Sequence, residues 1–297
     1  MSVALLLFPD FALILLGALL KRYARFELAF WTGLERMVYF VLFPSLLFNS
    51  TATAKLEFGS TAGLIVACLA AVATGIVLGW LARPLFKPSP LVFASGVQCA
   101  FRFNSYVGLA LAGRLAGREG IALMALAIGI AVPIANAAAV FALARHQQSN
   151  ILREMARNPL IIATVCGLGM NLAGLQLPEF VMATLQRLGS ASIALGLIAV
   201  GAGLRLAGTV VEKPTLAWWL AVKLLAAPLV AFLVARQWDV PPLQREIAVL
   251  FAALPTASSA YILAMRMGGN GAIVAFLISA GTILSVVTLP LWIIVAR

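Results

Sequence analysis

Charged residues are scarce in this chain. Asp, Glu, Lys and Arg make up 10% of its 297 residues, whereas 63% of the residues are hydrophobic. Soluble domains contain about 25% charged residues, so this composition excludes an ordinary soluble protein. No polar stretch is long enough to form a separate soluble domain. The sequence therefore predicts an integral membrane protein, with the lipid bilayer as its surroundings.

Histidine and cysteine are also rare. The single histidine, His146, and the three cysteines, Cys68, Cys99 and Cys166, show no metal-ligand spacing. This pattern argues against a multi-histidine metal site and a histidine-based catalytic triad, and it favours buried, inert thiols. The sequence shows no phosphate-binding loop and no nucleophile constellation. We therefore expect no metal, no cofactor and no enzymatic activity.

The net charge of +11 would indicate a nucleic-acid partner in a soluble protein. Here the Lys and Arg residues lie mainly in short joints between apolar runs, where they set the orientation of the chain in the membrane. We expect no nucleic-acid partner. The N-terminal run lacks the basic region and the cleavage site of a signal peptide, so we interpret it as the first membrane span.

Hydropathy and the Pro, Gly and basic joints predict an all-α fold. A spanning helix needs about 20 residues, so a chain of this length has room for about ten. The predicted transmembrane helices cover residues 3–20, 35–53, 60–82, 89–113, 120–144, 159–177, 180–206, 214–236, 242–267 and 270–296.

The predicted spans form two halves. Residues 145–158 are the longest polar connection, which separates a first five-helix repeat (1–144) from a second (159–297). Because five is odd, the second repeat enters the membrane from the opposite side, which gives the inverted repeat that recurs in secondary transporters. Alternate joints differ in Lys and Arg content, and the richer set is predicted to be cytoplasmic. This rule predicts that both termini lie on the outer side of the membrane and that the connecting loop lies in the cytoplasm.

Two spans are interrupted by polar residues near their middles. Arg102 lies in Gln98-Cys99-Ala100-Phe101-Arg102-Phe103-Asn104-Ser105, at a depth where a charge costs at least about 2.5–3.5 kcal/mol. In the second half, Leu254-Pro255-Thr256-Ala257-Ser258-Ser259 contains a proline that removes a helical hydrogen bond. Broken helices at equivalent places in two halves indicate a substrate site near the membrane midplane.

The chemistry of this site favours a small organic anion. Half-helix N-termini carry partial positive charge, and the guanidinium fork of Arg102 can hold a carboxylate bidentately. Other interpretations stay open at this point: Pro255 only kinks a helix, Arg102 is the counter-ion of a buried acid, and Ser258 and Ser259 bond their own helix.

Three further polar residues fall within spans. Asn136 follows Pro133 in the fifth span and is a candidate wall of the site. Asp10 is a coupling-proton candidate if it is buried, but its position near the N-terminus favours the outer surface. Lys223 follows Trp218 and Trp219, a pattern that favours snorkelling toward the membrane interface.

Several of these motifs resemble the auxin efflux carrier family, and more narrowly its bacterial permease branch associated with malonate or malate. The resemblance rests on Asn158-Pro159-Leu160 after a basic loop, Leu254-Pro255-Thr256-Ala257 with Tyr261 through Ala264, and Phe101 through Ser105 with Gly108. It covers nearly the whole chain.

This resemblance implies ten helices in two inverted repeats, with helices four and nine broken and crossing, as in bile-acid-symporter-like and sodium/proton-antiporter-like folds. It also implies a scaffold bundle, a moving transport bundle and an elevator motion, and it suggests a homodimer through the scaffold helices. Pro255 matches the crossing proline of helix nine, Asn104 the polar crossing residue of helix four, and Asn136 the polar residue of helix five. Plant members carry a proline near the helix-four crossing. This sequence has none there, which leaves the crossing geometry open.

We therefore expect a secondary transporter or permease for small organic anions, such as mono- or dicarboxylates, in the bacterial cytoplasmic (inner) membrane. The expected substrate-binding residues are Arg102, Asn104, Ser105, Asn136, Pro255, Thr256, Ser258 and Ser259. The rivals are an exporter of neutral or cationic amphiphiles, with a structural Arg102, and a membrane sensor without turnover. Substrate identity, direction of transport, coupling ion and oligomeric state stay open.

Overall fold

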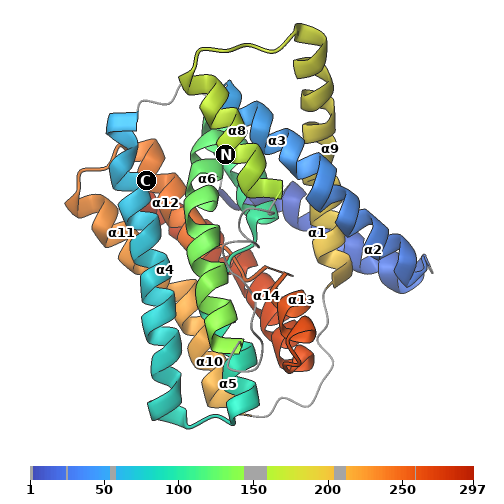
Figure 1. The fold of residues 1–297 in the computed structure, drawn as a ribbon. Coiled ribbons are helices and arrows are strands. Elements are labelled where there is room, and N and C mark those ends of the chain that lie inside the picture. The colour runs from blue at the N-terminus through green and yellow to red at the C-terminus, as the bar shows by residue number, and fades with distance from the viewer. Residues whose placement is uncertain (1–2, 25, 54–57, 144–158, 204–211, 258) are drawn as a thin grey trace. The chain divides into compact units, whose positions relative to one another are not determined.

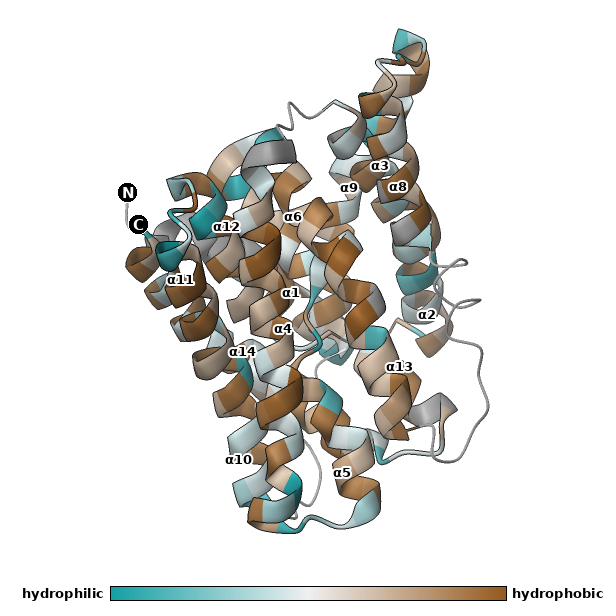
Figure 2. Ribbon diagram, turned by 60° about the vertical axis from the view of Figure 1, so that its left-hand side comes forward, coloured by the Kyte–Doolittle hydropathy of each residue, from teal (hydrophilic) through white to brown (hydrophobic). Residues whose placement is uncertain are grey.

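Helices make up most of the described chain. The computed structural model describes residues 3–24, 26–53, 58–143, 159–203, 212–257 and 259–297, and no strand occurs in those ranges. Each of the ten predicted spans contains helix. Five helical stretches of the described residues are long and apolar enough to cross a membrane: Thr61–Phe86, Pro90–Leu143, Glu179–Gly203, Lys213–Gln237 and Gly271–Ala296. Apolar residues cover most of the length of helices such as α4 and α14 (Figure 2).

The chain divides into two compact units, which cut across the two halves of the sequence. Unit 1 comprises Met1–Glu57, Tyr106–Gly129 and Leu152–Gly203, and unit 2 comprises Phe58–Ser105, Ile130–Ile151 and Leu204–Arg297. Each unit therefore takes helices from both halves. The five-helix repeats themselves remain a prediction from the sequence, and the connecting loop 145–158 lies outside the described residues.

Unit 1 is built around the packing of α1 on α9 and of α3 on α8 and α9. Its elements are α1 (Val3–Tyr23), α2 (Leu28–Met37), η1 (Val38–Leu42), α3 (Phe43–Ala52), α8 (Pro159–Leu172), α9 (Glu179–Gly203) and the first part of α6 (Ser105–Leu143). The Asn171 amide donates to the carbonyls of Thr51 and Ala52 at 3.1 and 3.0 Å. It thus caps the C-terminal end of α3, whose last carbonyls have no partner within the helix.

Unit 2 contains both interrupted spans. Its elements are α4 (Phe58–Phe86), α5 (Pro90–Gly96), η2 (Val97–Ala100), the end of α6, α10 (Lys213–Ala221), η3 (Val222–Ala226), α11 (Ala227–Gln237), α12 (Pro242–Ala253), α13 (Ser259–Arg266) and α14 (Gly271–Ala296). Figure 1 shows α4 beside α10 and α11, and α4 also packs against α12. The core of this unit lies around Ala71, Ala227, Ala231 and Ala252, whose small side chains let the helices approach closely.

Proline shapes the eighth predicted span without ending it. A π-helical turn, η3, precedes Pro228, just as the π-helical turn η1 precedes Pro44. Proline has no N–H and clashes with the carbonyl four residues earlier, and a widened turn accommodates both problems. The carbonyl left over by Pro228 is that of Leu224, and the indole N–H of Trp292 donates to it at 2.8 Å.

The ends of α8 and α4 differ from the predicted spans by about five and four residues. The sixth span was expected to run to residue 177, but α8 ends at Leu172, because Gly174 adopts a left-handed backbone (φ +64) that closes the last turn. The third span was expected to end at residue 82. Instead α4 continues through Pro84 to Phe86 and stops before Lys87, which has a positive φ of 48.

Candidate functional site

The two interrupted spans of unit 2 meet at their breaks. After η2 the backbone is non-helical from 101 to 104, where α6 follows, and after α12 it is non-helical from 254 to 257. The N–H of Asn104 donates to the carbonyl of Pro255 at 2.8 Å, and the Thr256 hydroxyl donates to the carbonyl of Cys99 at 2.8 Å. Each break thus supplies hydrogen-bond partners that the other has lost, as buried non-helical backbone requires.

The neighbouring helix α4 makes room for this meeting point. A Cβ atom added to Gly75 would lie 2.6 Å from the Ala100 carbonyl oxygen and 2.8 Å from the Phe101 Cβ. Both distances are too short for real carbon contacts, so a larger residue would push the break away from α4. Gly75 therefore lies directly against the break.

Arg102 connects three polar side chains of unit 2. Its guanidinium donates to Gln98 Oε1 at 3.1 Å, to Asn136 Oδ1 at 2.9 Å and to Ser259 Oγ at 3.1 Å. These three acceptors come from η2, the end of α6 and the start of α13. All three of these acceptors are neutral oxygens, so they orient the guanidinium and none of them adds a negative charge beside it.

The orientation of Gln98 is fixed from the other side. Its amide nitrogen donates to the carbonyls of Ser95 at 3.0 Å and Ala260 at 3.3 Å, which leaves the amide oxygen to accept from Arg102. Gln98 is fully buried. The sequence shows Gln98 four residues before Arg102, a spacing that places two side chains on one helix face, but it gives no sign of the bond to Ala260.

The described site residues differ in exposure. Ser259 is exposed, and Arg102, Asn136 and Ser105 are half-buried. In contrast, Asn104, Pro255 and Thr256 are buried, and the Thr256 hydroxyl is already bonded to Cys99. The structure therefore brings together Arg102, Asn136 and Ser259, which are partly or fully exposed, while Asn104, Pro255 and Thr256 join the two breaks.

Two predicted residues lie outside what the structure describes. Ser258 is one of them, and the side chain of Asp10 is the other. Lys223, in contrast, is described, and the expectation that it snorkels to the interface is wrong. Its side chain is only 4% exposed, and its ammonium donates to the carbonyl of Ala252 at 2.9 Å. The described His, Cys, Asp and Glu residues form no cluster that could hold a metal ion.

Comparison with known proteins identifies the family. A family model described as membrane transport protein matches residues 144–293, which is more than half of the chain. The chain belongs to this family, that of the auxin efflux carriers. It is also 28% identical to an uncharacterized transporter of Methanothermobacter thermautotrophicus over 298 aligned positions, which cover 95% of both chains. Membership of this transporter family agrees with the apolar helices of the described residues and makes this a membrane transport protein.

Proposed function

We propose that this family member is a secondary transporter, or permease, for small organic anions such as mono- or dicarboxylates. The observation that carries the proposal is the position of the Arg102 guanidinium. It donates to three neutral oxygens, and one of these belongs to Ser259, the first residue of α13. The N-terminal end of a helix carries partial positive charge. An anion bound there is stabilised by the helix end and by the fork of Arg102 together.

The accessible residues supply the rest of the proposed site. Asn136 and Ser259 hold Arg102 and present an amide and a hydroxyl to a bound carboxylate, with Ser105 nearby in sequence. Asn104, Pro255 and Thr256 keep the breaks open. The substrate crosses the membrane unchanged, so the proposal includes no enzymatic step.

The proposed mechanism is alternating access of the elevator type. Its support is that each compact unit combines helices from both halves of the chain: α1 to α3 with α8 and α9 in unit 1, and α4 and α5 with α10 to α14 in unit 2. An inverted repeat of ten transmembrane helices would produce this distribution. In the proposal, unit 2 carries the anion, and unit 1 is the scaffold through which two copies associate. The protein lies in the bacterial inner membrane with both termini outside.

Uptake by proteoliposomes tests the proposal. Radiolabelled malonate, malate and monocarboxylates are offered to the purified protein, with and without proton and sodium gradients. Arg102→Ala is expected to lower uptake of the transported anion by about a hundredfold or more, because the positively charged partner of the anion is lost. Arg102→Lys keeps the charge but loses the fork, and an increase of about tenfold in KM is expected.

Arg236→Ala is the matched control, since this arginine is exposed in the last turn of α11. It should leave uptake unchanged. Unchanged uptake in a folded Arg102→Ala variant would remove Arg102 from the site. Transport of a neutral substrate without competition by carboxylates would instead favour an exporter of amphiphiles.

A further inference from the structure

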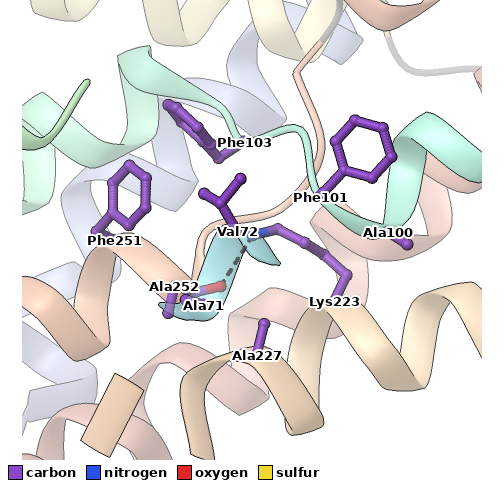
Figure 3. A pocket seen from close by; sticks show the side chains of 9 residues that line it. All are labelled: Ala71, Val72, Ala100, Phe101, Phe103, Lys223, Ala227, Phe251 and Ala252. Carbon is purple, nitrogen blue, oxygen red and sulfur yellow. Dashed lines mark hydrogen bonds between the residues drawn. The ribbon is translucent and has the colours of Figure 1, made fainter. Parts of the chain in front are cut away.

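A second cation, Lys223, is buried at the break of α12. Figure 3 shows its side chain extending from η3 to the end of α12, where the ammonium donates to the Ala252 carbonyl at 2.9 Å. An ammonium group withdrawn from water is costly unless it has polar partners. A lysine buried in this position therefore needs a polar partner.

The end of α12 supplies the partner. The last four carbonyls of a helix accept no hydrogen bond from an N–H of the same helix, and they give its C-terminal end partial negative charge. Helix α12 ends at Ala253, because Pro255 has no N–H with which to continue the helical hydrogen bonds. The Ala252 carbonyl is therefore one of these last four groups. The positive charge of Lys223 thus offsets the partial negative charge at this helix end, which exists only because the span is broken.

The first break lies against the same lysine. Ala100 and Phe101, at the end of η2, line one narrow crevice with Lys223, Phe103 and Phe251. This crevice has no room for a water molecule, and the rings of Phe103 and Phe251 lie 4.4 Å apart between their centroids. The ammonium is therefore shielded from solvent where the ends of both half-helices meet.

We propose that Lys223 is a positioning residue for anion transport, which holds the C-terminal ends of α12 and η2 together and so sets the geometry of Arg102. The link is covalent: Phe101 and Phe103, which line the crevice, are the two chain neighbours of Arg102. The inference rests on the proposed function for its transport readout, but the packing role of Lys223 can be measured without any substrate.

The two cations have opposite surroundings, which separates their roles. Lys223 lies at a helix C-terminal end, where a cation is favourable, whereas Arg102 donates to Ser259 at the N-terminal end of α13, where an anion is favourable. Lys223 thus already has a favourable partner in the protein, the carbonyl of Ala252. Arg102 gains from an added anion.

Hydrogen exchange of the full-length protein in detergent tests the positioning role directly. We compare Lys223→Met, which keeps the apolar stem, with Lys223→Gln, which keeps a donor without the charge. In both variants, peptides covering 98–105 and 250–260 should exchange about tenfold faster than in the wild type, since the helix end loses its cation. Val222→Ala is the control, because this buried neighbour lines a different hollow, together with Trp218 and Trp292.

Malonate uptake in proteoliposomes supplies the second readout. We expect KM for malonate to rise about tenfold in Lys223→Gln while kcat stays within about threefold, because Arg102 is present but less well oriented. In Val222→Ala the thermal midpoint should fall while KM and the exchange of both peptides stay as in the wild type.

The outcomes separate the two proposals. If both Lys223 variants exchange as the wild type does, or if KM is unchanged in Lys223→Gln, the positioning role is overturned. If the wild type takes up no carboxylate, the proposed function fails, and faster exchange in the variants would still establish that Lys223 holds the breaks together.

Discussion

The backbone N–H of Asn104 donates a 2.8 Å hydrogen bond to the carbonyl oxygen of Pro255, so each interrupted span directly supports the other. The Thr256 hydroxyl donates in the opposite sense, to Cys99. Non-helical backbone within a membrane is tolerated only where its polar groups find partners in the protein or in a wet cavity. The two breaks therefore depend on one another, and a change in one should be felt in the other.

Thr256→Val tests this dependence. Valine has nearly the shape of threonine but no hydroxyl, so the buried Cys99 carbonyl loses its donor. We expect the free energy of unfolding in detergent to fall by about 1–3 kcal/mol. Thr282→Val is the control, because the Thr282 hydroxyl donates to Ile278, within its own helix. Its loss should be smaller. A Thr256→Val variant with unchanged stability and a raised KM would assign the hydroxyl to the substrate instead.

The sequence predicts the breaks better than it predicts the contacts around them. Pro255 marks one interruption, because its missing N–H is visible in the sequence, and the polar run from Arg102 to Ser105 marks the other. Pro228 gives a different result, since a π-helical turn and the Trp292 indole absorb it without a break. A proline alone therefore does not distinguish a broken helix from a widened one.

Lys223 shows why the contacts around the breaks could not be predicted from the sequence. Its neighbours in sequence, Trp218 and Trp219, favour a side chain that reaches the membrane interface, but their indoles donate to Leu78 and Gly79 of α4 instead. The partner of Lys223 is a backbone carbonyl 29 residues away along the chain. Every residue has a backbone carbonyl, so the sequence does not show which carbonyl accepts a bond from a distant side chain. Neither this contact nor the Gln98–Ala260 contact could therefore be inferred from residue types.

Gly75→Ala tests how closely the first break must approach α4. The added methyl group would meet the Ala100 carbonyl and Phe101, so the segment that leads to Arg102 has to shift. We expect a loss of about 1–3 kcal/mol in unfolding free energy, the usual cost of overpacking, together with a higher KM for the transported anion. Gly281→Ala provides the comparison: its Cβ would meet only Leu220, at an ordinary 3.5 Å, so stability and KM should be nearly unchanged. Equal behaviour of the two variants would show that the close approach to α4 is dispensable.

Asn136→Asp tests whether the charge of Arg102 serves the substrate. The replacement keeps the acceptor oxygen 2.9 Å from the guanidinium but adds a negative charge, which forms an ion pair with Arg102 and competes with an incoming anion. We expect the KM for malonate or malate to rise by at least about tenfold, because the added carboxylate repels the substrate at short range. Uptake kinetics in proteoliposomes measure this change.

The comparison with Asn136→Ala gives the result its meaning. Alanine removes one of three described acceptors of Arg102 and adds no charge, so its effect on KM should be clearly smaller than that of aspartate. A purely structural arginine would give the reverse order, since an ion pair would hold it at least as firmly as the amide does, whereas alanine would release it. Uptake that is better preserved in Asn136→Asp than in Asn136→Ala would therefore contradict anion binding at Arg102.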